Sequence, residues 1–512
     1  MKRTLGLVGI AVFAFIGVSA QSNPAMQVTN AAAEALGGVQ RLQSVGVIVM
    51  EGSGMANNLG QARTPQGDDP DNPAEPTSTF EVTGFKRSID VANGRARQEW
   101  HRTPKFASPN PDATQNAGLD GDVAFNIGAN NQATPQGAAA AKARRFELIL
   151  SHPIGIIRAA LDPAAKVTNL QRQGNNDVVD VTTAKGDTVT LAVNRTTHLP
   201  ATVSVLVYQN YLGDSVNSAE FLDYQDANGV KLPTHIRTRL NNWLESDYTF
   251  KNTVNAQVNL AAPAMASPGV GRGGGGGGGA QEQGAIAEQV APGVWYLTGG
   301  GENSVLVEFA DHTELVEVPL TQARAEALFA KAKELVPNKP LTRAIVTHAH
   351  FDHSGGIRRV IAEGLTVATH EANRSFFEKV ARRKHTMQPD ALAKTPKAPT
   401  FDLVTDAGKI EKDATRTLQI IKFDDPTGHN AHMLMVYLPQ EKILVNADLF
   451  NWGGNFVRYP RAVALDEAIK KHKLDVAIHL PVHGRRGTKA DFESVLAAIK
   501  EGRQPPGLGL LR

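Results

Sequence analysis

Apolar and polar residues alternate along several short runs in the first half of the chain, and this period of two is typical of half-buried β-strands. The runs lie at 45–50, 178–182, 188–193, 201–207 and 230–236. Asn228 and Gly229 form a pair typical of tight hairpin turns, and residues 31–36 followed by Gly37 predict a short helix with a glycine cap. The pattern therefore predicts a mostly antiparallel sheet with one covered face.

Two stretches of this half lack the alternation. Residues 55–81 and 103–140 are rich in Asn, Gln, Pro, Ala and Gly, a composition that predicts loops or disorder. The histidines of this half are scattered, and we expect structural or surface roles for them: His101, His152, His198 and His235. No catalytic constellation is predicted in the first half.

From residue 288 onward, strand-like runs alternate with stretches of helical periodicity. The predicted strands lie at 294–298, 304–309, 313–318, 344–347, 417–423, 433–438, 442–447 and 474–478. The predicted helices lie at 322–335, 354–363, 371–384, 464–473 and 489–501. Strands and helices that alternate on this scale predict a layered α/β domain.

An unbroken run of glycine at 273–279 separates the two patterns. Consecutive glycines bury nothing and have maximal backbone entropy, so the run predicts a flexible linker. It lacks the Lys with Ser or Thr that a phosphate-binding glycine loop needs. The predicted organisation is an N-terminal domain at 21–262, a linker at 263–287, a C-terminal domain at 288–503 and a tail at 504–512.

Residues 1–20 have the three parts of a secretory signal peptide. Lys2 and Arg3 precede an apolar stretch at 5–18, and small residues end at Ala20. Cleavage after Ala20 predicts a periplasmic or secreted protein. The apolar stretch is shorter than the ~20 residues of a membrane-spanning helix, so stable membrane insertion is not expected.

Composition narrows the partners. The chain of 512 residues has 53 Lys and Arg against 51 Asp and Glu, a net charge of +2. A net charge this small does not produce an electrostatic field strong enough to recruit nucleic acid, so the expected partner is a small-molecule substrate. The pattern leaves the oligomeric state open.

The strongest chemical signal is the hexad His348-Ala349-His350-Phe351-Asp352-His353, which directly follows the apolar strand at 344–347. Imidazoles and carboxylates suit Zn²⁺, and because the chain has no cysteine, a site closed by thiolates is excluded. Four such ligands within six residues cannot all face one ion from a regular helix or strand, but they can where a strand ends and the chain turns. The hexad therefore predicts a two-metal site rather than a His-rich surface loop.

Three further candidate ligands follow downstream, each where a strand gives way to a loop. They are His429 before the run at 433–438, Asp448 after the run at 442–447, and His483 after Val482. A rigid sheet can hold side chains at such positions over one pocket.

With the hexad, Gly428-His429, Asp448 and His483-Gly484 in this order, residues 288–503 resemble the metallo-β-lactamase fold superfamily of metal-dependent hydrolases. The resemblance implies an α/β, four-layered αβ/βα sandwich behind the mostly antiparallel β N-terminal domain. It also implies two Zn²⁺ per chain, with iron as the alternative metal. The implied ligands are His348, His350 and His429 for the first zinc, Asp352, His353 and His483 for the second, and Asp448 as the bridge.

Two departures from the family refine this expectation. In the true β-lactamases, Cys or Ser stands at the position that Asp448 resembles. With a bridging Asp, this chain is instead similar to glyoxalase II, lactonases, phosphodiesterases and nucleases of the superfamily. Glu317 stands where the family usually has an Asp that supports the metal ligands. The N-terminal domain resembles the curved sheets of exported lipoprotein-carrier-like domains.

Together these features predict an exported dinuclear zinc-dependent hydrolase, in which a metal-bound hydroxide attacks an ester, lactone, thioester or phosphoester. Asp352 is the predicted catalytic residue, since it would both ligate a metal and orient the nucleophile. The alternatives are an iron-dependent sulfur dioxygenase on the same fold, a β-lactamase, and a non-catalytic binding protein.

Several residues near the predicted ligands receive weaker expectations. His432 is expected to support the site or the fold rather than bind metal, and His370 and His479 are expected to be ordinary sheet-end histidines. The basic run at 382–385 is expected to be a solvated helix end rather than a site for an anionic substrate. The residues after Asp448 are candidates to line the pocket: Phe450, Asn451, Trp452 and Asn455.

Overall fold

The computed structural model describes residues 23–71, 78–106, 113–128, 131–263, 284–453 and 459–503. The predicted signal peptide, the glycine run of the linker and the tail at 504–512 lie outside the described residues. Within the described residues, every helix is too short or too polar to cross a membrane.

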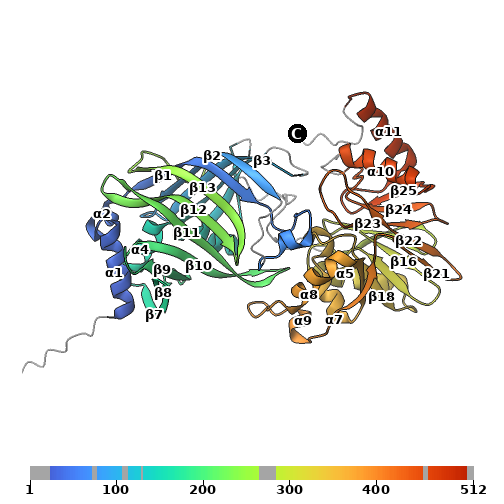
Figure 1. Cartoon of the computed structure of the whole chain (residues 1–512), viewed down its shortest axis with the longest axis horizontal. Helices are drawn as coiled ribbons and strands as arrows, with labels where there is room; N and C mark the ends of the chain where they lie inside the picture. The colour runs from blue at the N-terminus through green and yellow to red at the C-terminus, as the bar shows by residue number, and fades with distance from the viewer. Residues whose placement is uncertain are drawn as a thin grey trace, which may run out of the picture.

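The N-terminal domain is built on one sheet of thirteen strands, in the order β6-β5-β4-β3-β2-β1-β13-β12-β11-β10-β9-β8-β7 (Figure 1). All of its pairings are antiparallel, which confirms the predicted sheet type. Asn228 and Gly229 turn between β11 and β12 with φ of 57° and 79°, as predicted. The strands are β1 (Val47–Asn57), β2 (Thr79–Asp90), β3 (Arg95–Pro104), β4 (Ala113–Asp120), β5 (Val123–Ile127), β6 (Ala133–Pro135), β7 (Lys166–Gln173), β8 (Asn176–Thr182), β9 (Thr188–Asn194), β10 (Pro200–Gln209), β11 (Gly213–Ala227), β12 (Val230–Leu240) and β13 (Trp243–Val254).

Helices cover one face of this sheet and share its main core. The first begins at Pro24, earlier than predicted, because the Asn23 side chain caps its N-terminus, and it ends at Gly37 with φ of 130°. The covering helices are α1 (Pro24–Leu36), α2 (Val39–Ser44), α3 (Ala138–Arg145), the π-helical turn η2 (Phe146–Leu150) and α4 (Pro153–Ala160), and the 3₁₀ turn η1 (Pro65–Asp68) lies in the loop between β1 and β2.

The prediction of loops or disorder holds for 58–64 and 69–71, but it is wrong for both ends of 55–81 and for most of the described residues of 103–140. β1 continues to Asn57, β2 begins at Thr79, and the second stretch contains β4, β5, β6 and α3. Polar residues such as Asn116 and Gln115 take strand conformation because β4 pairs along its whole length with β3. Backbone pairing satisfies their N–H and C=O groups whatever the side chain, and tertiary context outweighs the low strand propensity.

The C-terminal domain contains two sheets. The first has the order β14-β15-β16-β17-β18-β19-β20 and the second the order β21-β22-β23-β24-β25-β26. The strands of the first are β14 (Ile286–Ala291), β15 (Val294–Thr298), β16 (Ser304–Glu308), β17 (Thr313–Val316), β18 (Leu341–Ile345), β19 (Thr366–His370) and β20 (Thr400–Val404). The strands of the second are β21 (Lys409–Lys412), β22 (Thr417–Phe423), β23 (Met433–Leu438), β24 (Ile443–Ala447), β25 (Ile478–Pro481) and β26 (Gly487–Thr488).

Three apolar clusters join the sheets and helices of this domain. One contains residues of both sheets, a second joins the first sheet to α5, α7 and α8, and a third joins the second sheet to α10 and α11. The helices are α5 (Gln322–Leu335), α6 (Phe351–Ser354), α7 (Ile357–Glu363), the 3₁₀ turn η3 (Glu371–Asn373), α8 (Arg374–Arg382), α9 (Ala391–Lys394), α10 (Tyr459–Lys471) and α11 (Lys489–Lys500). The layered α/β architecture was therefore predictable from the alternating pattern.

The last predicted strand of this domain is misplaced. We expect it at 474–478 from its apolar residues, but β25 runs from Ile478 to Pro481. Lys473 ends the preceding helix with φ of 53°, so the chain is still turning there. Parallel pairing with β24 then aligns Leu480 with Val445.

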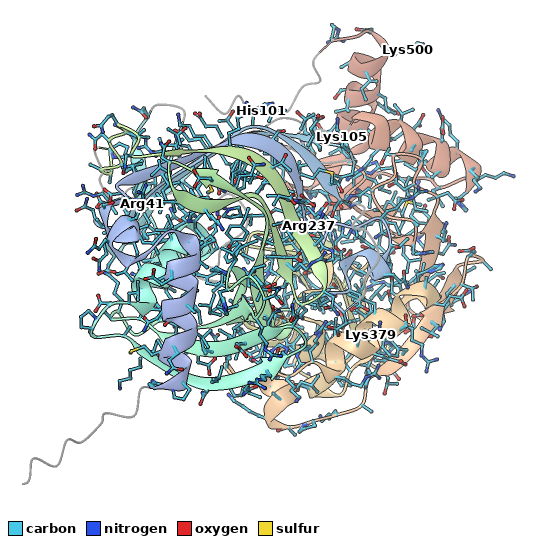
Figure 2. All side chains as sticks on the ribbon, turned by 60° about the vertical axis from the view of Figure 1, so that its left-hand side comes forward. Arg41, His101, Lys105, Arg237, Lys379 and Lys500 are labelled. Carbon is cyan, nitrogen blue, oxygen red and sulfur yellow. The ribbon has the colours of Figure 1, made fainter. Side chains whose placement is uncertain are left out.

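The two domains lie side by side (Figure 1), and polar contacts join them. Lys379 on α8, labelled in Figure 2, forms an ion pair with Asp69 of the N-terminal domain. The hairpin between β10 and β11 also reaches the C-terminal domain, where the backbone N–H of Asp214 donates to the carbonyl of Lys384 at 2.7 Å. Arg383, His385 and the backbone of Lys384 are thus part of the domain interface, whereas the side chains of Arg382 and Lys384 are exposed, as expected for a solvated helix end.

Candidate metal centre

The predicted ligands meet because strand ends converge on one edge of the domain. His348 follows β18, and Asp448 and His483 follow β24 and β25, which run parallel. His429 precedes β23, which is antiparallel to β24, so its position is at the same edge. Parallel strands place their carboxyl ends together, and the side chains that follow them meet there.

All seven predicted ligands lie in two groups. The first group contains His348, His350, His429 and Asp448, and the second contains Asp352, His353 and His483. Within each group the candidate ligand atoms all lie within 4.8 Å of one another. His348, His350 and His353 are fully buried, at 0% exposure.

Asp448 lies between the two groups. Its Oδ2 is 2.5 Å from Nε2 of His429, and its Oδ1 is 2.8 Å from Nε2 of His483. Oδ1 is also 3.4 Å from Nε2 of His353. The two oxygens of one carboxylate therefore face different groups, which is the geometry of a bridging ligand.

Hydrogen bonds on the outer side of three imidazoles determine which ring nitrogen faces the centre. His350 Nε2 donates to the carbonyl of Ala62 at 2.8 Å, His353 Nδ1 to Glu317 at 3.3 Å, and His483 Nδ1 to Glu302 at 2.5 Å. Carbonyl and carboxylate oxygens only accept, so the protons lie on these outer nitrogens. The inner nitrogens, Nδ1 of His350 and Nε2 of the other two, therefore face the centre, where a cation would bind them.

Glu317 occupies the supporting position that we expect for it. It is fully buried with φ of 70°, and it accepts hydrogen bonds from the hydroxyl of Thr347 and from His353 Nδ1. Since the Thr347 hydroxyl donates to Glu317, it accepts from His348 Nδ1 at 3.0 Å, and Nε2 of His348 faces the centre. The longer carboxylate thus supports two imidazoles, one directly and one through Thr347.

The residues fit a metal. The Nε2 atoms of His353 and His483 are buried and make no hydrogen bond of good geometry within the described residues. Buried polar nitrogens without such a bond are costly, and coordination of a cation would satisfy them. The donor set of imidazoles and carboxylates is the set that suits zinc.

The histidines of the centre differ in the direction in which the surrounding charges and burial shift their pKa values. Burial, helped by neighbouring histidines, lowers the pKa of His348 well below its usual value. Burial also lowers the pKa of His353, but the carboxylates of Asp448, Glu317 and Asp352 outweigh it and raise this pKa to about 10. Burial raises the pKa of Asp352, yet His353 and His483 hold it below its usual range. In the metal-free chain, the carboxylates around the second group therefore keep His353 protonated, and a bound cation would displace that proton.

Some residues of the centre were not predicted. Gln61 donates from Nε2 to Asp352 Oδ1 at 3.0 Å, and the Ala62 carbonyl accepts from His350, although no functional residue was expected in the N-terminal domain. Glu302 supports His483, and Arg461 lies 4.0 Å from Asp448 Oδ2. A Glu before a strand or a backbone carbonyl in a polar loop carries no sequence signal for such a role.

Other candidate residues lie elsewhere. His432 stacks on His370 with ring centroids 4.9 Å apart and belongs to neither ligand group. Phe450 packs against His479 and Phe492 at 5.2 and 4.9 Å, within a core cluster. Trp452 packs against that cluster, Asn451 is buried, and Asn455 lies outside the described residues.

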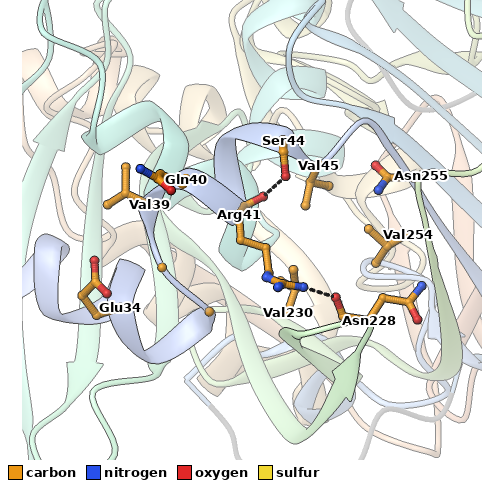
Figure 3. Close-up of a pocket in the computed structure, with 12 residues that line it drawn as sticks. Glu34, Val39, Gln40, Arg41, Ser44, Val45, Asn228, Val230, Val254 and Asn255 are labelled. Atoms are coloured by element: carbon orange, nitrogen blue, oxygen red, sulfur yellow. Dashed lines mark hydrogen bonds between the residues drawn. The ribbon is translucent and has the colours of Figure 1, made fainter.

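A separate cavity of about 790 Å³ lies in the N-terminal domain, between α1, α2 and the turn at Asn228 (Figure 3). Arg41 enters it but donates to the carbonyl of Asn228 at 2.8 Å, so its charge is already engaged within the chain. Among the described residues, both candidate metal groups lie outside this cavity. The metal centre therefore remains the candidate functional site.

Comparison with known proteins agrees with this assignment. Residues 297–483 match the family model described as "Metallo-beta-lactamase superfamily", which supports a metal-dependent hydrolase. Similar solved structures include a metallo-beta-lactamase from Pontibacter korlensis, 18% identical with a TM-score of 0.30, covering 42% of this chain and 99% of that one. A metallo-beta-lactamase from Erythrobacter litoralis is 20% identical with a TM-score of 0.29, covering 42% and 96%. The mono-zinc form of FIM-1 from Pseudomonas aeruginosa is 18% identical with a TM-score of 0.31, covering 43% and 97%.

Proposed function

Since residues 297–483 form a metallo-beta-lactamase superfamily domain, we propose that this protein is a dinuclear zinc-dependent hydrolase of an ester, lactone, thioester or phosphoester. One observation carries the proposal: the two carboxylate oxygens of Asp448 face two separate groups of ligands. We also propose that the two sheets and their covering helices form the four-layered αβ/βα sandwich. The three apolar clusters support that arrangement.

When bound, two Zn²⁺ ions would lower the pKa of a shared water toward neutrality and polarise the substrate oxygen. The chain's own residues prepare this site. Glu317, Glu302 and the Ala62 carbonyl hold imidazole protons on the outer nitrogens, so the inner nitrogens face the centre, where a cation would bind them in place of any proton they carry. Asp352, held as a carboxylate, would ligate a metal and orient the nucleophile, and it is the proposed catalytic residue.

The identity of residue 448 supports the choice of substrate class. A carboxylate between the groups adds negative charge and draws two cations together, which favours a clamp on one shared water. Such a clamp is less open than the site that the carboxylate of a penicillin, cephalosporin or carbapenem would need. We therefore propose ester, lactone, thioester or phosphoester hydrolysis ahead of β-lactam hydrolysis.

Metal analysis of the full chain, purified without chelator, tests the proposal. We expect close to two zinc ions per chain and turnover of at least one substrate in a panel of esters, lactones, thioesters and phosphodiesters. His429→Ala should lower both metal content and turnover, whereas His432→Ala, three residues away and outside both groups, should lower neither. Predominant iron would favour the dioxygenase reading, and well under one metal per chain would favour a binding protein.

We also propose that the protein is exported. The charged, apolar and small-residue parts of residues 1–20 support this. Expression in a bacterial host followed by fractionation should place the chain in the periplasm or the medium, with a mature N-terminus at Gln21. A chain that stays in the cytoplasm with residues 1–20 intact would contradict the proposal.

A further inference from the structure

We propose that residues 58–71 of the N-terminal domain, named here the docking loop, are a working part of the metal centre. In this proposal Gln61 is a positioning residue for Asp352, and the backbone of Ala62 positions His350. The inference rests on the proposed function, because it concerns the affinity of the same two ligand groups for metal. It assigns a role to a domain in which the sequence predicts no functional residue.

The docking loop is held in a defined conformation from its own side. The buried carboxylate of Asp68 accepts hydrogen bonds from the backbone N–H groups of Gly60 at 2.7 Å and Ala62 at 2.8 Å. Trp243 at the start of β13 donates from its indole nitrogen to the carbonyl of Gly67 at 2.9 Å. Connecting segments normally lie on the surface, so a loop with this much burial and internal bonding has a specific place to occupy.

That place is against the C-terminal domain. The docking loop appears in Figure 1 as the blue segment that reaches the other domain. The carbonyl of Arg63 accepts from the backbone N–H of Ala431 at 2.8 Å, two residues after His429. Gly60, with φ of 81°, lies so close to Phe351 that an added Cβ would be 2.6 Å from the ring. The loop thus contacts the chain beside His429 and within the hexad.

The contact with His350 selects a tautomer. His350 Nε2 is 2.8 Å from the Ala62 carbonyl, and a carbonyl can only accept. The proton therefore lies on Nε2, and Nδ1 keeps its lone pair, 3.1 Å from Nε2 of His348. Without the loop, solvent could satisfy either nitrogen and the ring could turn.

The contact with Asp352 divides the roles of its two oxygens. Gln61 Nε2 donates to Oδ1 at 3.0 Å, while Oδ2 is 3.4 Å from Nε2 of His483 in the second group. The amide therefore fixes the rotation of the carboxylate with Oδ2 turned toward the second group. Partners of metal ligands that act in this way typically change metal affinity about 10–100-fold when removed.

Ion pairs hold the docking loop against the C-terminal domain without contacting the candidate metal ligands. Asp69 pairs with Lys379, and Asp71 pairs with Arg383 at 3.1 Å. These contacts explain why the loop stays against α8, but neither touches a ligand. Gln61 is half-buried and supports no other described element, so its removal tests the positioning role with little effect on folding.

The experiment compares Gln61→Ala, Gln61→Glu and the matched control Gln173→Ala in the full chain. Gln173 is an exposed glutamine at the end of β7. Zinc affinity is measured by competition with a chromophoric chelator, and the Tm of the metal-free protein is measured in parallel. We expect Gln61→Ala to weaken the second zinc about 10–100-fold while the first zinc and the metal-free Tm stay unchanged. Gln61→Glu should weaken it further, because two carboxylates would then face each other.

The outcomes separate this inference from the proposed function. Wild-type affinity for both zinc ions in both Gln61 variants would overturn the positioning role. A drop in the metal-free Tm together with equal loss of both zinc ions would also overturn it, since that result indicates a purely structural residue. A wild-type chain that binds no zinc would instead overturn the proposed function.

Discussion

Glu317→Gln is the substitution that most directly tests how the centre is supported. Glu317 is buried at 0% exposure and accepts from the Thr347 hydroxyl and from His353 Nδ1. A glutamine has the same shape but only one accepting oxygen and no charge. Both donors contact Oε1, whereas Oε2 faces the backbone N–H of Thr347 at 3.4 Å, so the NH₂ group must face either both donors or that N–H. In either orientation a buried donor loses its acceptor, and any contact that remains is to a neutral oxygen, which holds the His348 and His353 rings less firmly.

The magnitude follows from these contacts. A hydrogen bond to a charged group contributes about 1.5–3 kcal/mol, and the amide loses at least one buried bond together with the carboxylate charge. We therefore expect the metal-free protein to lose about 2–3 kcal/mol of stability. For a domain of this size, that corresponds to a Tm lower by roughly 4–12 °C. Because the rings of His348 and His353 lose their alignment, zinc affinity should also fall about 10–100-fold.

The assay is thermal unfolding of chelator-treated protein, followed by zinc competition titration of the same preparation. Glu334→Gln is the control, since Glu334 forms an exposed ion pair with Lys331 on α5 and should change stability by less than about 0.5 kcal/mol. If Glu317→Gln matched the control in both Tm and zinc affinity, the supporting role of this carboxylate would be refuted.

Four further outcomes are expected. Asp448→Ala should reduce metal content to one ion or fewer per chain, measured by elemental analysis, and should abolish hydrolysis in a substrate assay. Two retained ions would show that the carboxylate is not a bridge. Removal of metal with a chelator should abolish turnover, and added Zn²⁺ should restore it; unchanged turnover would exclude a metal-dependent reaction. Penicillins, cephalosporins and carbapenems should be hydrolysed with kcat/KM below about 10⁴ M⁻¹s⁻¹, so faster turnover would overturn the substrate assignment. Burial lowers the pKa of His152 from 6.5 to about 3, so below pH 6.5 the unfolded chain takes up a proton that the folded chain does not. Acidification from pH 7 to pH 5 should therefore lower the free energy of unfolding by on the order of 2 kcal/mol. Denaturant titrations at both pH values should find that His152→Leu lacks this part of the acid sensitivity.

The sequence determined the candidate ligand set and the layered architecture around it. Side chains with metal-binding chemistry occur in one hexad and at three later strand boundaries. Apolar runs mark β23 and β24 and overlap β18, although the strand before His483 lies later than its apolar run predicts. These are local signals, because the residue type indicates the metal-binding chemistry and the neighbouring hydrophobic pattern predicts the strand or helix. Even α5 lies at the predicted residues, Gln322–Leu335.

Only the tertiary structure decided how those ligands are oriented and what the N-terminal domain contributes. The Ala62 carbonyl holds His350 from 288 positions away in the chain, and the acceptor is a backbone atom that every residue possesses. Gln61 and Asp68 lie in a polar stretch whose composition predicts a loop, and their partners exist only once β1, β13 and the hexad are in place. A hydrogen bond depends on distance and direction between two atoms, and neither quantity is encoded in the composition of either segment. Only the folded chain determines this distance and direction. The candidate ligands could therefore be predicted from the sequence, whereas the groups that support them could not.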